Sequence, residues 1–337
     1  MTRFSVGLLN EYKNEYLVEI AKEIDVDENY KNLFVADERL YRNTYSQLAI
    51  VAENTDRIGI GTGVTNPYTR NPAITAASIS TISELSEGRA ILGLGAGSPM
   101  ILDQLGISQK HSIETMRDTT YAIKELNRGN RVTMESKCFS MKNAELNFVS
   151  EYDIPVFIAG RGPKILALGG EIGDGVIAGA GLSSVPGMNY ARENIDKGIE
   201  ISGMNVDVKD TICWAFLSVA GDRDTALESV IDIIIRIVHA VPIKTLEAIG
   251  IPKKDVNDLK NIGDIDRLKP QDAREMVTDG IINQFAIAGT LEECCFRVEE
   301  LINSGVEHIA VLPFENQEYM AKEMLRQFSE NVVEEVK

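Results

Sequence analysis

Two glycine-rich segments, separated by one helix-length segment, constrain this chain more than any other feature. Residues 57–64 read RIGIGTGV and lead into TNPYTRNP, and residues 89–97 read RAILGLGAG. Between them, residues 73–85 alternate apolar and small side chains with a length and period that suit a helix. Parallel strands joined by a helix bring both glycine-rich ends to the same edge of a sheet, where α/β proteins place their ligands. The segment therefore predicts a β-α-β unit with a ligand site at that edge.

Short apolar runs alternate with helix-like segments along the rest of the 337 residues. We expect strands at residues 4–9, 33–36, 58–64, 90–95, 154–159, 175–178, 211–219 and 308–312. Eight strands with intervening helices, joined by right-handed crossovers, favour a closed barrel over an open doubly wound sheet. The sequence thus predicts an α/β fold of the (β/α)8 TIM-barrel class, with residues 1–337 as a single domain.

Three segments depart from the strand–helix alternation. Residues 132–148 contain short alternating stretches with polar breaks, which predicts a hairpin outside the barrel. Residues 241–284 are charged and rich in turns, and we expect an insertion that covers the barrel mouth and acts as a lid. Residues 285–290 lead into a helix, with Thr290 as its N-cap.

The charge balance excludes several classes of partner. The chain has 34 basic and 51 acidic residues, for a formal net charge of −17. Such a surface repels phosphate backbones and anionic lipid, so we expect no nucleic-acid or membrane role and a small-molecule substrate instead. The first nine residues read as a strand rather than a signal peptide, which predicts a cytoplasmic location. The three histidines and four cysteines show no metal-type spacing, so no metal site is expected.

Polar and small residues follow several predicted strands. Asp37 and Glu38 come directly after the second strand. In a barrel this position lies on the catalytic face; the alternative is a solvated turn with a helix cap. The sequence GRGPK, residues 160–164, follows the fifth strand and is either a phosphate cradle at a helix N-terminus or a tight turn. Residues 173–181 repeat the pattern. They contain the sixth strand, residues 175–178, and again end in small side chains that let a phosphate or ribityl chain approach.

Taken together, residues 61–76, 85–97, 160–164 and 173–175 resemble the bacterial luciferase-like superfamily. Within it they are most similar to the coenzyme F420-dependent methylenetetrahydromethanopterin reductases. The resemblance covers most of the chain. It implies a TIM barrel that holds a deazaflavin or flavin at the carboxyl ends of its strands, and a role in one-carbon metabolism.

The resemblance also implies roles for individual residues. A non-prolyl cis peptide on the third strand, which backs the deazaflavin ring, falls at Gly63–Val64; the alternative is an ordinary bulge within residues 61–63. The cofactor-binding residues that the resemblance implies are Asp37, Gly63, Val64, Thr65, Ala96, Gly97, Gly160, Gly162, Pro163, Ala178 and Gly179.

Three positions depart from the family pattern. Glu38 stands where many F420-dependent members have a histidine, Gly7 where the reductases have a glutamate, and Ser98 where they have an acidic residue. Glu38 is therefore the candidate catalytic acid or base, because a carboxyl group in a covered pocket has a pKa suited to proton transfer. The alternative is a glutamate that forms a salt bridge with Arg39, Arg42 or Arg70.

The resulting hypothesis is an F420-dependent oxidoreductase that moves a hydride between the deazaflavin and a small organic or pterin-type substrate. The alternatives are an FMN-dependent monooxygenase of the same fold and a binding protein without turnover. Fold analogy with luciferase-like proteins also predicts a homodimer.

Overall fold

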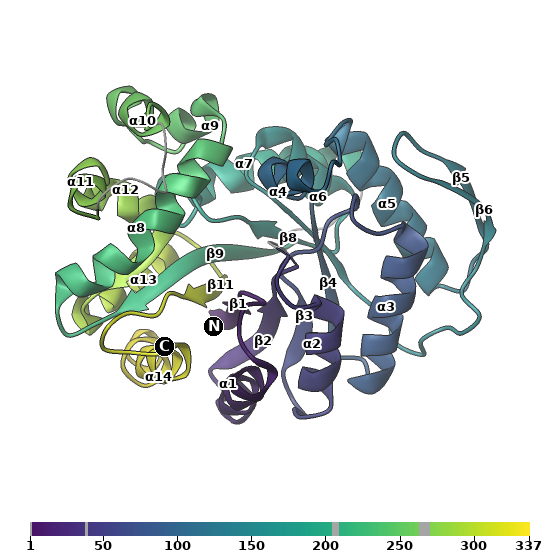
Figure 1. Cartoon of the computed structure of the whole chain (residues 1–337), viewed down its shortest axis with the longest axis horizontal. Helices are drawn as coiled ribbons and strands as arrows, with labels where there is room; N and C mark the ends of the chain where they lie inside the picture. The colour runs from purple at the N-terminus through teal and green to yellow at the C-terminus, as the bar shows by residue number, and fades with distance from the viewer. Residues whose placement is uncertain (1, 38–39, 204–208, 263–269) are drawn as a thin grey trace.

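Eight parallel strands close into a barrel. The structure is a computed structural model that describes residues 2–37, 40–203, 209–262 and 270–337. The last ring strand, β11, pairs back with β1, which closes the ring and confirms the predicted TIM barrel (Figure 1). In ring order the strands are β1 (Arg3–Leu8), β2 (Tyr30–Val35), β3 (Gly59–Thr62), β4 (Ala90–Gly95), β7 (Val156–Gly160), β8 (Gly175–Ala178), β9 (Asp210–Val219) and β11 (His308–Pro313).

Amphipathic helices surround the ring. In α1 the buried residues Leu17, Ile20, Ala21 and Ile24 recur at three- and four-residue spacing, so one face packs against the sheet. The capping box that Thr290 forms with Glu293 starts α13, as predicted. The helices that alternate with ring strands are α1 (Asn14–Val26), α2 (Thr44–Ala52), α3 (Pro72–Leu85), α4 (Pro99–Gln104), α5 (Ser112–Asn127), α6 (Pro163–Ile172), α7 (Val185–Ser202), α8 (Arg223–Ala240), α13 (Leu291–Asn303) and α14 (Ala321–Phe328). The last of these, α14, continues through a π-helical turn, η2 (Ser329–Val333), into α15 (Glu334–Val336).

A ninth parallel strand, β10 (Ala286–Gly289), lies outside the ring. Phe216 and Leu217 of β9 pair with β11 on one edge and with β10 on the other. β8 pairs only with β9 residues up to Cys213, so β10 occupies the edge that β8 leaves free. The sequence analysis did not predict this strand and treated residues 285–290 only as the approach to a helix.

Two excursions lie at opposite ends of the molecule (Figure 1). The antiparallel hairpin of β5 (Val132–Glu135) and β6 (Ser140–Ala144) confirms the predicted hairpin beside α5. At the other end, α9 (Ile243–Ala248), α10 (Lys253–Lys260), α11 (Pro270–Met276) and α12 (Asp279–Phe285) gather around α8. Across the ranges given above, none of the helices has the length and apolar character to cross a bilayer.

Candidate active site

A cavity of about 1210 Å³ opens at the carboxyl ends of the ring strands. Its walls come from the segments that follow β1, β2, β3, β4, β7 and β8, from side chains of β9, and from the last turns of α8. One part of the lining is glycine and alanine at the ends of β3, β4 and β7, and another part is aromatic and aliphatic. The cavity therefore has a wall of small residues that a flat ring can approach closely.

The small-residue wall is shaped by a bulge between β3 and β4. Gly61 pairs with Ile91, and pairing resumes where Thr65 bridges Leu94, so three β3-side residues face two on β4. The peptide bond between Gly63 and Val64 inside this bulge is cis, as the sequence analysis predicted. Figure 1 shows β3 and β4 side by side in the wall of the barrel. Gly63 and Val64, the two residues of this bond, both line the cavity.

Glycines on β4 allow this close approach. A Cβ atom added at Gly93 would lie 2.1 Å from the Thr62 carbonyl oxygen, and one added at Gly95 would lie 2.7 Å from a methyl of Val64. The backbone is further fixed because the Thr65 N–H donates to the Gly93 carbonyl at 2.9 Å. Larger residues at either glycine would push the two strands apart.

The loop after β4 is held by a side chain from farther along the chain. Gly97 has φ of +75°, a left-handed conformation that favours glycine. The Gln109 amide donates to the carbonyl of Ala96 at 2.6 Å and to that of Gly97 at 3.0 Å. Ser98, in the same loop, also lines the cavity.

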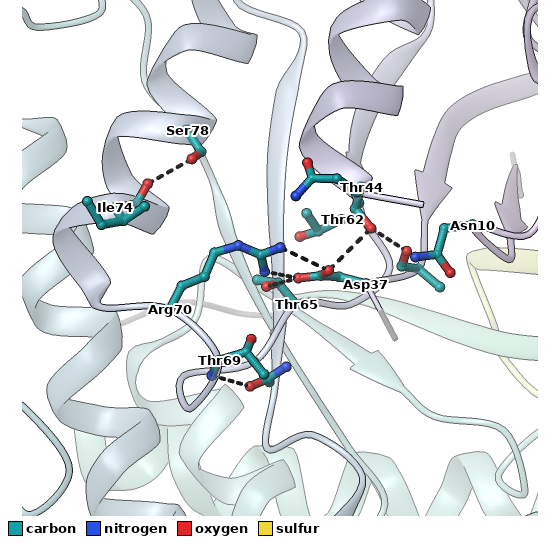
Figure 2. Close-up of polar contacts among 12 residues, drawn as sticks. Asn10, Asp37, Thr44, Thr62, Thr65, Thr69, Arg70, Ile74 and Ser78 are labelled. Carbon is teal, nitrogen blue, oxygen red and sulfur yellow. Dashed lines mark hydrogen bonds and ion pairs between the residues drawn. The ribbon is translucent and has the colours of Figure 1, made fainter. Parts of the chain in front are cut away.

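Asp37, at the end of β2, is the centre of a polar cluster (Figure 2). The Thr65 hydroxyl donates to Asp37 Oδ2 at 2.7 Å, and the Arg70 guanidinium binds both carboxylate oxygens. Thr44 donates to the neighbouring Ala36 carbonyl and lies 3.4 Å from Asp37 Oδ1. The Arg70 guanidinium also lies 5.0 Å above the ring of Tyr45. Asp37 thus joins the loops that follow β2 and β3.

The cluster perturbs the titration of its members. Burial works to lower the pKa of Arg70, but the hydrogen bond and the charge of Asp37 raise it further than burial lowers it. Burial, with the negative charge of Asp37 added to it, raises the pKa of Tyr45 to about 12. Arg70 is therefore charged and Tyr45 neutral throughout the physiological range.

The segment between β7 and α6 lines the cavity with the N-terminal end of α6. Gly162 is the N-cap of α6 and has no side chain to satisfy the first-turn N–H groups, and a Cβ added there would meet nothing within 4 Å. Arg161 is fixed because its Nε donates to the Ala180 carbonyl at 2.6 Å. Lys164 lines the same part of the cavity. A helix N-terminus with adjacent cations is a favourable environment for an anion.

The cavity differs in charge from the protein as a whole. The chain carries a net charge of −17, yet Asp37 is the one carboxylate among the described residues that line the cavity. The basic side chains on its walls are Arg42, Arg70, Arg161, Lys164 and Arg236, with His239 nearby. This contrast favours an anionic ligand.

Nearly all the predicted cofactor-binding residues meet at this cavity. The residues on its walls are Asp37, Gly63, Val64, Ala96, Gly97, Gly160, Gly162, Pro163 and Gly179. Thr65 is buried behind the wall as a partner of Asp37, and Ala178 is buried in β8. Glu38, the candidate catalytic group, lies outside the described residues. The direct role of each residue in cofactor binding stays a prediction.

Sequence reasoning missed several residues of the cavity. Arg70 was weighed as a partner for Glu38, whereas it binds Asp37. Arg161 and Lys164 stand inside the predicted phosphate turn and were detectable as cations in an anion-binding segment. The apolar side gave no such signal. Ile177, Trp214, Phe216 and Leu312 read as ordinary buried strand positions, and Phe314 follows the last predicted strand.

Comparisons with known proteins agree with this geometry. The family model described as luciferase-like monooxygenase matches residues 1–308. The 5,10-methylenetetrahydromethanopterin reductase of Archaeoglobus fulgidus is 35% identical over 300 residues, covering 88% of each chain. The enzyme of that name from Methanolobus tindarius is 35% identical over 285 residues, covering 84% of this chain and 85% of its own.

Among solved structures, the coenzyme F420-dependent tetrahydromethanopterin reductase from Methanopyrus kandleri superposes with a TM-score of 0.84. It is 25% identical, and the superposition covers 100% of this chain and 99% of that one. The fold, the bulged strand and the sequence matches point to the same group of proteins. The chain belongs to the luciferase-like monooxygenase family.

Proposed function

We propose that this protein is a coenzyme F420-dependent oxidoreductase that transfers a hydride between the deazaflavin and a pterin-type one-carbon carrier, as a methylenetetrahydromethanopterin reductase does. The observation that carries the proposal is the bulged small-residue wall beside a cationic turn, within one cavity of an acidic protein. The two relatives at 35% identity, both named 5,10-methylenetetrahydromethanopterin reductase, support it.

The residues present fit F420. The Gly63–Val64 bulge and the β4 glycines offer backbone to one face of a flat ring, since side chains at Gly93 or Gly95 would collide with β3. The N-terminus of α6 with Arg161 and Lys164 would hold the phosphate, where the helix dipole and the cations both favour negative charge. When bound, F420 supplies the hydride chemistry through its deazaflavin ring.

The described polar residues position the ligand rather than exchange protons with it. Asp37 is held by Arg70 and Thr65, so its carboxylate has a fixed orientation and a permanent cationic partner. That arrangement fixes the wall where β2 and β3 end. Proton transfer is assigned by prediction to Glu38, and replacement by glutamine tests it through the pH profile of turnover.

Titration of the purified protein with F420 and with FMN tests the cofactor. We expect saturable binding of F420, followed by its fluorescence, and weaker binding of FMN. Tight FMN binding without F420 binding would contradict the proposal and favour the monooxygenase alternative.

Turnover is tested with reduced F420 and methylenetetrahydromethanopterin, by the return of the visible absorbance of oxidised F420. We expect stoichiometric formation of the methyl product. F420 binding without turnover of this substrate, or of a panel of alcohols and aldehydes, would favour the binding protein without catalysis.

We also propose that the chain is a homodimer and that its outer α3 face is the contact. Ile74 and Leu85 on α3 are 59% and 39% exposed, and the helix carries no charged residue before Glu84. Light scattering of the wild type and of Ile74→Lys tests this, and a monomeric wild type would contradict it. The cytoplasmic location stays a prediction, tested by cell fractionation.

The region 241–284 is proposed to cover the cavity mouth together with α8. Supporting this, Ile233, Ile237 and Ala240 of α8 line the cavity, and α10, α11 and α12 pack on α8. Slower hydrogen exchange of this region upon addition of F420 is the expected result, and unchanged exchange would contradict it.

A further inference from the structure

The single tryptophan of the chain, Trp214, reaches across the interior of the barrel. It stands on β9, where its backbone pairs with Ala310 of β11, and its carbonyl accepts a hydrogen bond from the Ser183 hydroxyl at 2.7 Å. Its ring centroid lies 5.9 Å from that of Phe34 on β2. The side chain is only 8% exposed, yet it lines the cavity. The indole is therefore shared between the barrel core and the ligand cavity.

Two glycines on other strands make room for this indole. A Cβ atom added at Gly7 on β1 would lie 2.4 Å from Trp214 Cζ2, and one added at Gly63 beyond β3 would lie 2.8 Å from Cη2. Real Cβ atoms do not approach other heavy atoms so closely, so the indole fits only because both positions lack a side chain. The indole on β9 thus packs against Gly7 on β1 and against Gly63 just after β3, two positions that are distant from it in sequence.

The indole also separates the cavity from what lies beneath it. Trp214 faces the cavity, whereas Gly7 and Phe34, which it contacts, do not line it. Within the described chain, no residue of β1 (Arg3–Leu8) lines the cavity. The space above Gly7, through which a β1 side chain would enter, is filled by an apolar ring without an ionisable group.

The rest of that wall has the same character. Phe216 follows Trp214 on the same face of β9 and packs edge-to-face on Phe314, with ring centroids 5.0 Å apart. Both line the cavity together with Leu312. A ligand group that reaches this depth therefore meets aromatic and aliphatic surface, where an unpaired charge or hydroxyl would lose its hydration without compensation.

We propose that Trp214 is a specificity-determining residue that forms the floor of the ligand cavity. Its indole limits how deeply a ligand enters beside the Gly63–Val64 bulge. It also selects ligands whose deepest group is neutral and apolar, such as the edge of a heteroaromatic ring. The ligand class rests on the proposed function, whereas the position of the floor does not.

Two substitutions of Trp214 test the proposal. Trp214→Ala removes the floor, and we expect the Kd for F420 or the KM for the pterin substrate to rise at least tenfold. Trp214→Phe keeps a flat apolar ring and should stay within about threefold of the wild type. Phe296→Ala is the matched control, because this side chain on α13 is 60% exposed and does not line the cavity; it should change neither constant. Wild-type constants in Trp214→Ala would overturn the proposal.

Free indole gives a readout that does not depend on F420. We expect indole to raise the melting temperature of Trp214→Ala by several degrees and that of the wild type by none. In the same variant, indole should recover most of the lost ligand affinity. If the wild type binds neither F420 nor FMN, the proposed function is wrong, but the role of Trp214 as the cavity floor can still be tested with indole. Failure of indole to stabilise Trp214→Ala would refute that role.

A double substitution tests the fit between Trp214 and Gly7. Gly7→Ala alone should lower the melting temperature and weaken F420 binding, because its Cβ collides with the indole. In the Trp214→Ala background the same change should have little further effect. Additive effects would mean that the indole does not occupy the space above Gly7, and would contradict the proposal even where Trp214→Ala is poorly folded.

Discussion

The ion pair between Asp37 and Arg70 gives the most quantitative test of the site. The two side chains are 11% and 20% exposed, and the carboxylate also accepts a hydrogen bond from Thr65 at 2.7 Å. Replacing Asp37 by alanine leaves the Arg70 guanidinium partly buried against Tyr45 without its counter-ion. Loss of one partner of a buried pair costs about 3–5 kcal/mol. Because this pair keeps some contact with solvent, we expect about 2–3 kcal/mol of lost unfolding free energy.

A double-mutant cycle with Asp37→Ala and Arg70→Met measures the interaction itself. We expect a coupling free energy of about 1.5–2.5 kcal/mol from urea unfolding followed by circular dichroism. The control is the pair of Lys197 and Glu193 on α7, whose N–O distance is 2.8 Å but whose side chains are 54% and 69% exposed. Exposed helix pairs contribute about 0.3–0.5 kcal/mol. A coupling at Asp37–Arg70 no larger than that of the control would refute the argument from burial.

Three further predictions concern the bulge, the base of the barrel and the phosphate turn. Gly93→Ala places a Cβ 2.1 Å from the Thr62 carbonyl, so we expect weaker F420 binding and about 1–3 kcal/mol of lost unfolding free energy; unchanged values would contradict the packing argument. Burial alone would raise the pKa of Asp210, but the hydrogen bond and the charge of His308 outweigh burial and lower this pKa. Asp210 therefore stabilises the fold at pH values above its unfolded pKa of about 4, and this stabilisation is lost as the pH falls through the lower folded pKa. Urea midpoints measured from pH 6 to pH 3 should therefore fall less steeply in Asp210→Asn than in the wild type, and equal slopes would argue against it. Lys164→Ala should weaken F420 binding about three- to tenfold and reduce the salt dependence of binding, because one exposed charge contact is lost. Binding of a deazaflavin that lacks the phosphate should not change. Equal effects on both ligands would place Lys164 away from the phosphate.

The hydrogen-bond network around Asp210 has the Ser-His-Asp order of a catalytic triad but lies away from the cavity. Ser5, His308 and Asp210 are linked by contacts of 2.8 Å and 3.0 Å, in the order of a hydrolase triad. Ser5 is fully buried at the opposite end of β1 from the cavity, and Asp210 binds Arg3 through both oxygens. The network joins β1, β9 and β11 where the ring closes, which is a structural role.

The sequence alone determined the order and position of the ring strands. Each buried parallel strand is a short apolar run bounded by polar or small residues, and such a run is visible without knowledge of its neighbours. The motif resemblance also located the cis bond at Gly63–Val64 and nine of the residues that line the cavity, because these residues fall in short motifs that are each continuous along the chain. β10 was not predicted, because its pairing with β9 outside the ring is set by the tertiary structure.

Only the tertiary structure decided which distant residues meet. Arg70 could not be assigned to Asp37 from sequence, because 33 positions separate them and the contact exists only after β2 and β3 pair. The fit of Trp214 against Gly7 and Gly63 depends on closure of the ring across β9, β11 and β1. A residue pattern reports whether a side chain is buried, whereas the partner against which it is buried is set by how the strands close around one interior.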